Sequence, residues 1–344
     1  MNKGSVQNFF EDFRIGQVFE CPTPRVLTDA DRVAYITFTG DRTPRFCSAT
    51  GLVHPLIVFH TVLGQTVRHI SLNAHANLGY AEMMWGTPVR VGDEIHTIAQ
   101  VTGLKENSNL KTGIVYVKTK GKNQRDETVL EYVRWVMVEK RGESATPYLR
   151  EPSVPQLAAT VRGEQLRLAP FEPSCTKVSG GTFYFEDYAV SERIFHVDGM
   201  TINSSDHMCF TKLYQNSARV HFDSLRTSGR PLVYGGLPLS IGYALAYNGI
   251  ENRFGIAAIN AGTHAHPVYA GDTLYAFTDV IDKVDLPSPR SAMRLRLIVV
   301  KNEQPEKATP FQIKVTDPQS KREGYSENVV LDLDYWEIIA KRKE

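Results

Sequence analysis

The chain repeats part of itself after half of its length. Residues 9–13 read Phe-Phe-Glu-Asp-Phe, and residues 184–188, 175 positions later, read Tyr-Phe-Glu-Asp-Tyr. Residues 88–93 share a Pro-Val-x-x-Gly-Asp pattern with residues 267–272, at an offset of 179 positions. Solenoid repeats have periods of about 20 to 50 residues, so a match at half of the chain length indicates a duplicated domain. Because the two offsets are so similar, we predict two copies of one fold with only small insertions.

The bulk composition suits two folded domains. A length of 344 residues is enough for about two domains. The chain is 42% hydrophobic and 22% charged, which argues against a disordered or fibrous protein. Its formal net charge of +1 provides no overall attraction for nucleic acid. No stretch approaches the ~20 apolar residues of a membrane span, and the first residues lack the apolar run of a secretory signal. We therefore expect a cytoplasmic protein.

The cysteine and histidine positions give no sign of a metal centre. The four cysteines are scattered without a C-x-x-C pair, and no Cys/His cluster has the spacing of zinc ligands. With so few cysteines in so long a chain, we expect them to be reduced and to serve as small, buried apolar residues. They are Cys21, Cys47, Cys175 and Cys209.

The first half has the pattern of an α+β unit. Thr-Asp-Ala-Asp at residues 28–31 provides a cap and first-turn acids, which predict the start of a helix. Apolar residues then recur at spacings of three and four from Leu56 to Ile70, as on one face of a long buried helix. Residues 113–119 and 129–138 are rich in β-branched and aromatic side chains around a polar turn, which predicts an antiparallel hairpin.

The second half repeats this order. Residues 237–245 carry the helical pattern, and residues 295–300 and 327–339 read as strands. We predict an N-terminal domain at residues 1–140, a linker at 141–180 and a C-terminal domain at 181–344. Five prolines forbid a long helix in the linker. Its length would let the two halves pack as a pseudo-dimer, much as the subunits of a C2 homodimer pack.

The two copies differ at positions that could carry chemistry. The repeat places Asp41 on Asn216 and Phe46 on His221. His221 stands five positions after Asn216, and Pro-Leu-Val-Tyr-Gly at residues 231–235 leads into the predicted helix. One copy therefore has a titratable imidazole where the other has a phenyl ring. This difference suggests one working site and one retired copy.

This spacing resembles the MaoC-like (R)-specific enoyl-CoA hydratases. Their pattern is an acidic residue, a histidine five positions later, and a Pro-apolar-apolar-His-Gly turn that opens the central helix. The resemblance covers both halves and implies an α+β double hotdog, in which two fused hotdog units each wrap an antiparallel sheet around a long helix. Longer stretches resemble the members of this family that act on mesaconyl-CoA, and they lie at residues 71–74, 77–82, 103–109, 132–138 and 213–222.

The resemblance implies reversible syn addition of water to a C=C bond conjugated to a thioester, with mesaconyl-CoA and β-methylmalyl-CoA as the expected pair. The coenzyme A thioester is the substrate, and no metal or further cofactor is implied. Negative charge on the thioester oxygen needs fixed donors, and the N–H groups of Gly235 and Gly236 at a helix start suit that need. His221 titrates near neutrality and is the expected general acid/base.

Asn216 departs from the family pattern, which has an acidic residue there. An amide cannot act as a base, so we expect Asn216 to position water or substrate, with Asp206 or Asp223 available to assist. The first copy keeps Asp41 but has Phe46, and residues 58–60 stand in place of residues 234–236. That copy is expected to be inert, or to hold the acyl-CoA tail or form the opposite wall of the site.

Arg219 and Arg230 flank the expected site. A guanidinium clamp formed by them would recognise the free carboxylate of mesaconyl-CoA, although both could instead be surface charges or phosphate contacts. Other plain alternatives remain: His221 could be tied to a carbonyl, Asn216 could be a cap, and Gly235 with Gly236 could form a tight turn. His54 and His60 are expected to be structural, and one of His264 and His266 could face the cleft.

Three other functions compete with the main hypothesis. The first is hydration of a different short enoyl-CoA. The second is a hotdog thioesterase, which attacks the carbonyl carbon and typically uses a carboxylate in the helix. The third is non-catalytic binding of acyl-CoA. The expected partners are an acyl-CoA and a second copy in a homodimer, with no nucleic acid and no membrane.

Overall fold

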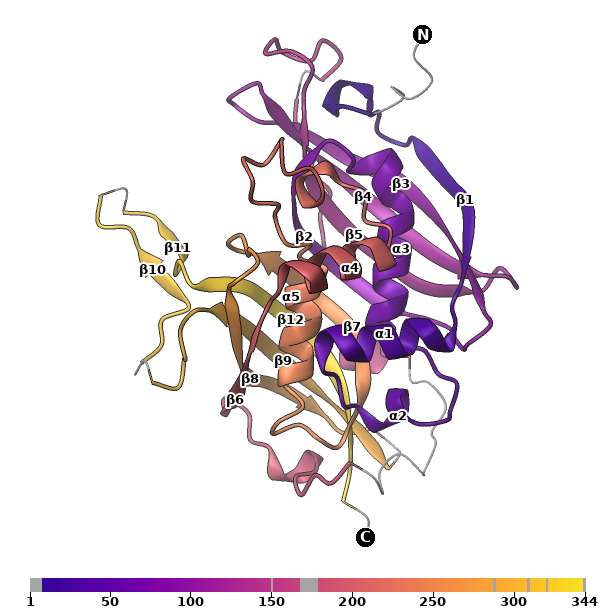
Figure 1. Ribbon diagram of the computed structural model, residues 1–344, viewed down its shortest axis with the longest axis vertical. Helices are drawn as coiled ribbons and strands as arrows, with labels where there is room; N and C mark the ends of the chain where they lie inside the picture. The colour runs from indigo at the N-terminus through magenta and orange to yellow at the C-terminus, as the bar shows by residue number, and fades with distance from the viewer. Residues whose placement is uncertain are drawn as a thin grey trace.

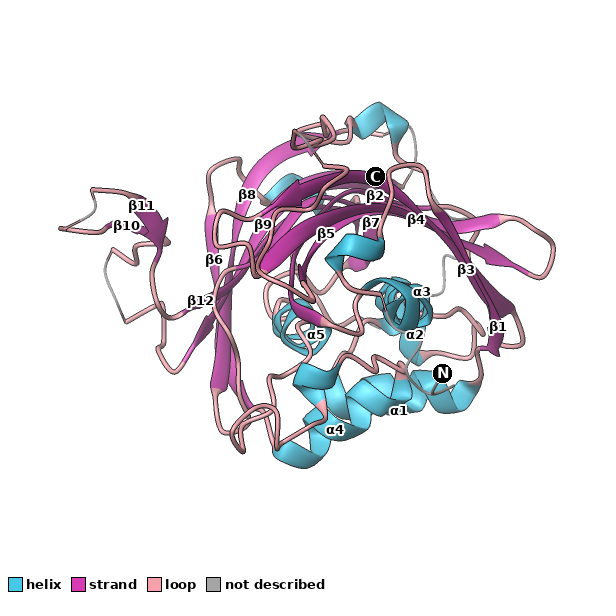
Figure 2. Ribbon diagram, turned by 90° about the horizontal axis from the view of Figure 1, so that it is seen from above, coloured by secondary structure: helices cyan, strands magenta, loops and turns pink. Residues whose placement is uncertain are grey.

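A single antiparallel sheet curves around two helices in the computed structural model, which describes residues 8–149, 151–167, 179–286, 289–307, 310–319 and 321–342 (Figure 1). The sheet has ten strands in the order β1-β3-β4-β5-β2-β7-β12-β9-β8-β6. It arches over α3 and α5, while α1 and α4 lie on the side of these helices away from the sheet (Figure 2). The arrangement confirms the predicted α+β double hotdog.

Each half contributes five strands to this sheet. The N-terminal half supplies β1 (Val18–Val26), α1 (Asp29–Thr39), α2 (Pro44–Cys47), α3 (Pro55–Ile70), β2 (Ala74–Trp85), β3 (Glu94–Glu106), β4 (Thr112–Asn123) and β5 (Thr128–Glu139). The C-terminal half supplies β6 (Arg193–Thr201), α4 (Ser204–Leu213), α5 (Gly236–Leu245), β7 (Arg253–His264), β8 (Thr273–Val284), β9 (Arg290–Lys301) and β12 (Val329–Ala340). A separate hairpin of β10 (Lys314–Thr316) and β11 (Glu323–Tyr325) projects from the second half (Figure 1).

The central pair β2 and β7 joins the halves. Gly79 pairs with Thr263 and Met84 pairs with Ala258 in antiparallel register. The strand order outward from β2 matches the order outward from β7. The duplication found in the sequence is therefore an approximate twofold axis that passes through the middle of one continuous sheet.

The repeated Gly-Asp turns have the same geometry in both halves. Gly92 and Gly271 have φ values of 95° and 98°, which an L side chain rarely adopts. The aspartate after each glycine accepts a hydrogen bond from the backbone N–H three residues earlier, at 2.8 Å for Asp93 and 2.9 Å for Asp272. The prediction that these glycines serve turns is confirmed.

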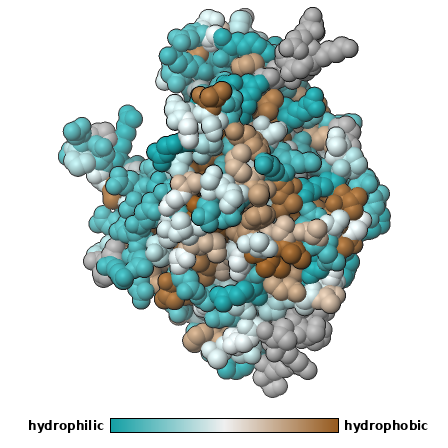
Figure 3. All heavy atoms as spheres, viewed as in Figure 1, coloured by the Kyte–Doolittle hydropathy of each residue, from teal (hydrophilic) through white to brown (hydrophobic). Residues whose placement is uncertain are grey.

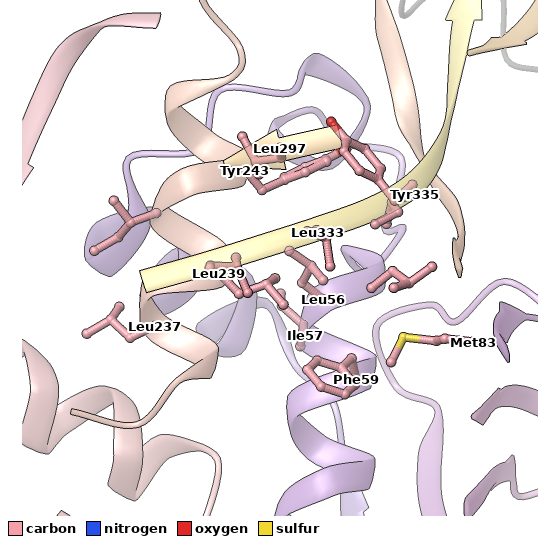
Figure 4. Packing of buried hydrophobic residues seen from close by; sticks show 14 of the residues in the cluster. Leu56, Ile57, Phe59, Met83, Leu237, Leu239, Tyr243, Leu297, Leu333 and Tyr335 are labelled. Carbon is pink, nitrogen blue, oxygen red and sulfur yellow. The ribbon is translucent and has the colours of Figure 1, made fainter. Parts of the chain in front are cut away.

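Two buried helices form the centre of the core. Leu56 and Ile57 of α3 and Leu239 of α5 pack against Leu333 and Tyr335 of β12 (Figure 4). A helix that is apolar on nearly all sides is typical of a buried core element. Fully burying one leucine stabilises the fold by about 1.5–3 kcal/mol, so this packing holds both helices firmly against the sheet.

The predicted elements are present, with one error about side-chain burial. The helix pattern from Leu56 to Ile70 corresponds to α3, and the predicted hairpin is β4 and β5. Thr28 caps α1, and its N–H donates to Asp31 Oδ2 at 2.8 Å. Cys21 is buried, but Cys47 and Cys209 are exposed, so the expectation of buried cysteines was wrong for these two; Cys175 lies outside the described residues. All three described cysteines are free thiols.

The segment between the halves crosses the sheet. Its Ser153 pairs with Leu104 of β3 through two hydrogen bonds of 2.8 Å. Farther along, Val161 accepts a hydrogen bond from the indole of Trp336 in β12 at 2.8 Å and donates to Asn260 of β7 at 2.7 Å. Residues 150 and 168–178 of the predicted linker lie outside the described residues.

The face shown in Figure 3 has apolar side chains gathered over its middle and hydrophilic side chains around them. Among the described residues, no helix is both long enough and apolar enough to cross a membrane.

Candidate active site

A cavity of about 520 Å³ lies between the two halves. The C-terminal half supplies one wall from the segment that contains Asn216 and His221, from the start of α5 and from the end of β7. The N-terminal half supplies the facing wall from Phe59 and Leu63 of α3 and from the beginning of β2. Its volume is within the usual range for small-molecule pockets, about 300–1,000 Å³.

His221 is a buried neutral imidazole with a fixed tautomer. It ends a short 3-10 turn, Arg219–His221, and its Nδ1 lies 2.7 Å from the carbonyl oxygen of Leu232. A carbonyl oxygen only accepts, so Nδ1 carries the hydrogen and Nε2 presents a lone pair. Burial lowers the pKa of His221 to about 4, assisted by nearby His207 and opposed by the bond to Leu232. At neutral pH this ring is ready to accept a proton.

Gly235 and Gly236 stand at the beginning of α5, as the sequence predicts. Within the described chain, neither N–H donates to an internal acceptor. The first N–H groups of a helix have no intrahelical partner, and the helix dipole favours negative charge at this end. A Cβ on Gly235 would lie 2.7 Å from the ring of His264, and one on Gly236 would lie 2.5 Å from the ring of Tyr234. Only glycine fits between the helix start and these rings.

The imidazole of His221 lies close to this helix start. Its ring centroid is 5.9 Å from that of Tyr234, the residue directly before the two glycines. His221, Tyr234, Gly235 and Gly236 all line the cavity. The lone pair of a base and a set of unpaired amide donors are therefore offered to one bound molecule.

Asn216 also lines the cavity and is 4% exposed. Its Oδ1 accepts a hydrogen bond of 3.3 Å from the N–H of Ala218, so the Nδ2 amide is left as a donor. Such a group can hold a water oxygen or a substrate oxygen but cannot remove a proton. Asp206 is a first-turn acid of α4, on the outside of the protein, where it accepts a hydrogen bond from Asn203.

The structure separates the two arginines of the predicted clamp. Arg230 lines the mouth of the cavity, is exposed, and stacks over the ring of Tyr269 at 4.2 Å from its centroid. Arg219 is not among the lining residues, and its guanidinium donates to Asn73 Oδ1 at 3.1 Å. The geometry does not bring the two guanidinium groups together on one ligand.

Both members of the histidine pair left open by the sequence line the cavity. His264 Nε2 lies 2.6 Å from the hydroxyl of Tyr80, and His266 Nδ1 lies 2.9 Å from the carbonyl oxygen of Val329. Burial lowers the pKa of His264 to about 4, so this ring is neutral at pH 7. Tyr80 belongs to β2 of the first half, a contribution to the site that the sequence did not predict.

Sequence reasoning also missed Arg134. This arginine of β5 is 1% exposed and lines the cavity. A signal was present, because it shares the inward face of the strand with Leu130, Tyr132, Val136 and Val138, all of them buried. Arginine on such a face is rare unless it is paired or functional.

The counterpart site in the first half is filled. Asp41 Oδ1 lies 3.2 Å from Arg253 Nη2, and Asp41 Oδ2 lies 3.0 Å from His54 Nε2. Phe46 packs edge-on against His54, with ring centroids 4.6 Å apart. The cavity beside this cluster measures only about 80 Å³. This cavity is much smaller than the one beside His221.

One predicted equivalence between the halves was wrong. Residues 58–60 do not match the glycine turn, because α3 begins at Pro55 with His54 as its cap. Residues 58–60 lie within the buried helix, where His60 Nδ1 is 3.0 Å from the hydroxyl of Tyr234. Proline is common at the first position of a helix, so Pro55 is the sequence signal that could have located this start.

Neighbouring groups keep Asp41 of the filled site ionised in spite of its burial. Burial opposes ionisation of Asp41, but the hydrogen bond and charge of His54 and the charge of Arg253 hold the pKa of Asp41 far below its usual value. Burial raises the pKa of Glu337, which accepts hydrogen bonds from the Tyr243 hydroxyl and the Gly255 N–H, to about 7. Among the described residues, no group of three or more His, Cys, Asp or Glu side chains is placed to hold a metal ion.

Solved structures place the fold among the MaoC-like dehydratases. A MaoC domain protein dehydratase from Chloroflexus aurantiacus is 39% identical, with a TM-score of 0.91 over 100% of both chains. A double-hotdog protein from Mycobacterium tuberculosis has a TM-score of 0.71 at 22% identity, over 96% of this chain and 98% of its own, and shares the fold.

Sequence relatives narrow this class further. A family model described as mesaconyl-CoA hydratase matches residues 2–310. The mesaconyl-CoA hydratase of Cereibacter sphaeroides is 42% identical, over 98% of this chain and 100% of the relative. The beta-methylmalyl-CoA dehydratase of Chloroflexus aurantiacus is 41% identical, over 97% of both chains. The chain belongs to the mesaconyl-CoA hydratase family.

Proposed function

We infer that the protein reversibly adds water to mesaconyl-CoA (2-methylfumaryl-CoA) to give β-methylmalyl-CoA. Membership of the mesaconyl-CoA hydratase family supports the substrate. The observation that carries the chemistry is the neutral His221, whose Nε2 lone pair shares one cavity with the unpaired N–H groups at the start of α5. The remaining roles follow from these two features.

In the hydration direction, the thioester carbonyl oxygen binds the N–H groups of Gly235 and Gly236. They stabilise the negative charge that develops on this oxygen as water attacks the β-carbon. Nε2 of His221 removes one proton from the attacking water, and the hydroxyl stays on the β-carbon. The protonated imidazole then returns that proton to the α-carbon on the same face. Water is thus added with syn geometry, and His221 ends neutral.

Asn216 holds the attacking water through its Nδ2 amide in this mechanism. Its Oδ1 is occupied by the N–H of Ala218, so the amide presents a hydrogen to the water oxygen and leaves both water hydrogens available to the base. The second acid/base group of the wider family is thereby replaced by a positioning group, and His221 handles the proton alone.

The thioesterase alternative lacks its usual carboxylate here. Neither α3 nor α5 contains an Asp or a Glu. The alternative of another short enoyl-CoA keeps the same catalytic residues and differs only in the acyl pocket. The accompanying expectations of a homodimer, a cytoplasmic location, and no metal or further cofactor belong to the same proposal. Sedimentation velocity tests the homodimer directly.

The decisive experiment follows the oxygen. Enoyl-CoAs whose acyl groups have four or five carbons are incubated with the protein in ¹⁸O water. Mass spectrometry then measures the incorporation of ¹⁸O into the products, and free thiol is measured in parallel. We expect ¹⁸O in the β-hydroxyl of the mesaconyl-CoA product, no thiol release, and a loss of about 100-fold or more in rate for His221→Ala. Thiol release with ¹⁸O in a free acid would identify a thioesterase instead.

A further inference from the structure

Arg134 is a buried cation with only neutral partners. Its guanidinium donates to Thr66 Oγ1 at 2.9 Å, to Asn77 Oδ1 at 3.2 Å and to Ser71 Oγ at 3.4 Å. Its Nε–H has no hydrogen-bond partner among the described residues. No carboxylate of the described chain forms an ion pair with it. A charge buried in this way is costly unless an opposite charge completes the site.

Arg253 is also a deeply buried guanidinium, and it has the partner that Arg134 lacks. Arg253, 3% exposed, pairs with Asp41 at 3.2 Å. Burial opposes its charge, yet neighbouring groups that include Asp41 and Glu337 raise the pKa of Arg253 above its usual value. Burial instead lowers the pKa of Arg134, and the groups that oppose this are two phenols and a thiol, which are neutral at pH 7. The fold therefore supplies a carboxylate partner for Arg253 but, among the described residues, none for Arg134.

Arg134 lies on the cavity wall opposite the proposed catalytic groups. It lines the cavity together with its hydrogen-bond partners Ser71 and Asn77, all three from the N-terminal half. Arg134 also interacts electrostatically with Tyr234, the residue before Gly235. Burial raises the pKa of Tyr234 far above its usual value, and the positive charge of Arg134 opposes this rise. A small acyl group held at Gly235 and Gly236 would extend toward this guanidinium.

We propose that Arg134 binds the free carboxylate of a dicarboxylic enoyl-CoA and thereby determines the substrate class of this site. The inference rests on the proposed hydratase function. In mesaconyl-CoA the carboxylate is attached to the β-carbon that water attacks, so it lies only a few bonds from the thioester. The planar guanidinium matches a carboxylate geometrically, and its Nε–H supplies a free donor. Neutralising this carboxylate also lowers the repulsion that it exerts on charge developing in the reaction.

A carboxylate fits better than a phosphate of coenzyme A. Arg134 is a buried residue of the cavity wall, only 1% exposed, and the phosphates of coenzyme A are separated from the thioester by the long pantetheine arm. The exposed Arg230 at the mouth is in a better position for them. Arg134 thus takes the role that the sequence had suggested for Arg219 and Arg230.

The test compares two substrates that differ in the carboxylate. Wild type, Arg134→Met and Arg134→Gln are assayed with mesaconyl-CoA and with (E)-2-methylcrotonyl-CoA, which has a methyl group in place of the carboxylate and is otherwise the same. We expect kcat/KM for mesaconyl-CoA to fall by at least about 100-fold in both variants, while kcat/KM for (E)-2-methylcrotonyl-CoA changes by less than about fivefold. Arg219→Met should leave the ratio between the two substrates unchanged.

A binding measurement keeps the proposal testable apart from catalysis and from variant folding. Calorimetry on wild-type protein compares succinyl-CoA with butyryl-CoA, two saturated ligands of equal chain length. We expect succinyl-CoA to bind at least about tenfold more tightly. Equal affinities, an equal loss for both substrates in the variants, or a ratio that responds to Arg219→Met would each overturn the assignment. If wild type hydrates no enoyl-CoA but still prefers succinyl-CoA, the proposed hydration fails while the carboxylate site stands.

Discussion

The hydroxyl of Tyr80 lies 2.6 Å from Nε2 of His264, across the central strand pair where the two halves meet. This bond holds the imidazole ring directly over Gly235, so that a Cβ added to Gly235 would stand 2.7 Å from its Cε1 atom. The start of α5 is therefore enclosed by a ring that is itself anchored on the opposite half. The unpaired amides face the cavity through a gap that only glycine leaves open.

Gly235→Ala should abolish most activity without unfolding the protein. The new methyl group would push His264 or the helix start away and misplace the amide donors. Loss of one such donor typically costs about 100-fold in kcat, so a decrease of that order is expected for mesaconyl-CoA hydration. Gly324→Ala provides the control, because nothing lies within 4 Å of the added Cβ. Equal activity in the two variants would argue against an amide role for Gly235.

The pH dependence of hydration should report the low pKa of His221. The imidazole accepts a proton only when it is neutral, and its folded pKa is about 4. We expect kcat/KM for mesaconyl-CoA to be flat from pH 8 down to about pH 5.5 and to fall below that. Stopped-assay rates over this range, corrected for enzyme inactivation, would check it. An inflection near the ordinary value of about 6.5 would instead indicate a solvated base.

Stability should decline with acid because of buried neutral histidines. Burial lowers the pKa of His196 to about 4, and both ring nitrogens have hydrogen bonds, to Asn248 at 2.7 Å and to Thr278 at 2.8 Å. The unfolded ring binds a proton near pH 6.5 and the folded ring only near pH 4. This contribution is therefore complete above about pH 6.5 and is lost as pH falls toward 4, with a slope of about 1.4 kcal/mol per pH unit.

Urea unfolding at pH 7, 6 and 5 would measure that slope. His196→Gln should reduce the dependence of the unfolding free energy on pH, whereas His75→Gln, at an exposed position, should not. Identical slopes for wild type and His196→Gln would show that the buried ring does not control the acid response.

The filled site should contribute to stability and not to catalysis. Asp41→Asn leaves the buried Arg253 without its carboxylate, and breaking such a pair typically costs about 3–5 kcal/mol. Removing both charges with Asp41→Asn and Arg253→Met should recover part of that loss. Hydration per folded molecule should be unchanged in Asp41→Asn. Asp126→Asn, which breaks an exposed pair with Lys122, should have no measurable effect on unfolding.

Local rules were enough to predict most of the fold. The helix from Leu56 to Ile70 and the hairpin around the turn at residues 123–126 were both predicted correctly. Each prediction depends only on residues that are near one another in the chain. Gly92 and Gly271 could be predicted as turn residues because positive φ is a local requirement. The candidate site residues His221, Asn216, Gly235 and Gly236 could be proposed together because they lie within 21 positions of one another, and the structure places all four on one cavity.

The features of the site that the sequence did not predict depend on contacts between segments that are far apart in the chain. The alternation in β5 places Arg134 on the inward face, but it does not show that this face lines a cavity completed by residues some 100 positions later. Arg219 is near the site in sequence, but its side chain turns to Asn73 of the other half. The partner of Asp41 is Arg253, more than 200 residues away, so the sequence could indicate a retired site but not the ion pair that fills it.

The joining of the two halves in one chain, through the pairing of β2 with β7, has an evolutionary consequence. In a dimer of identical subunits, every substitution is made twice, once on each side of the axis. Here both sides are encoded separately, so Asp41 and Arg253 could close one pocket while Tyr80, Arg134 and His264 shaped the other. A ligand with a thioester at one end and an acid at the other has no symmetry of its own, and a fused chain is free to match it with unlike walls.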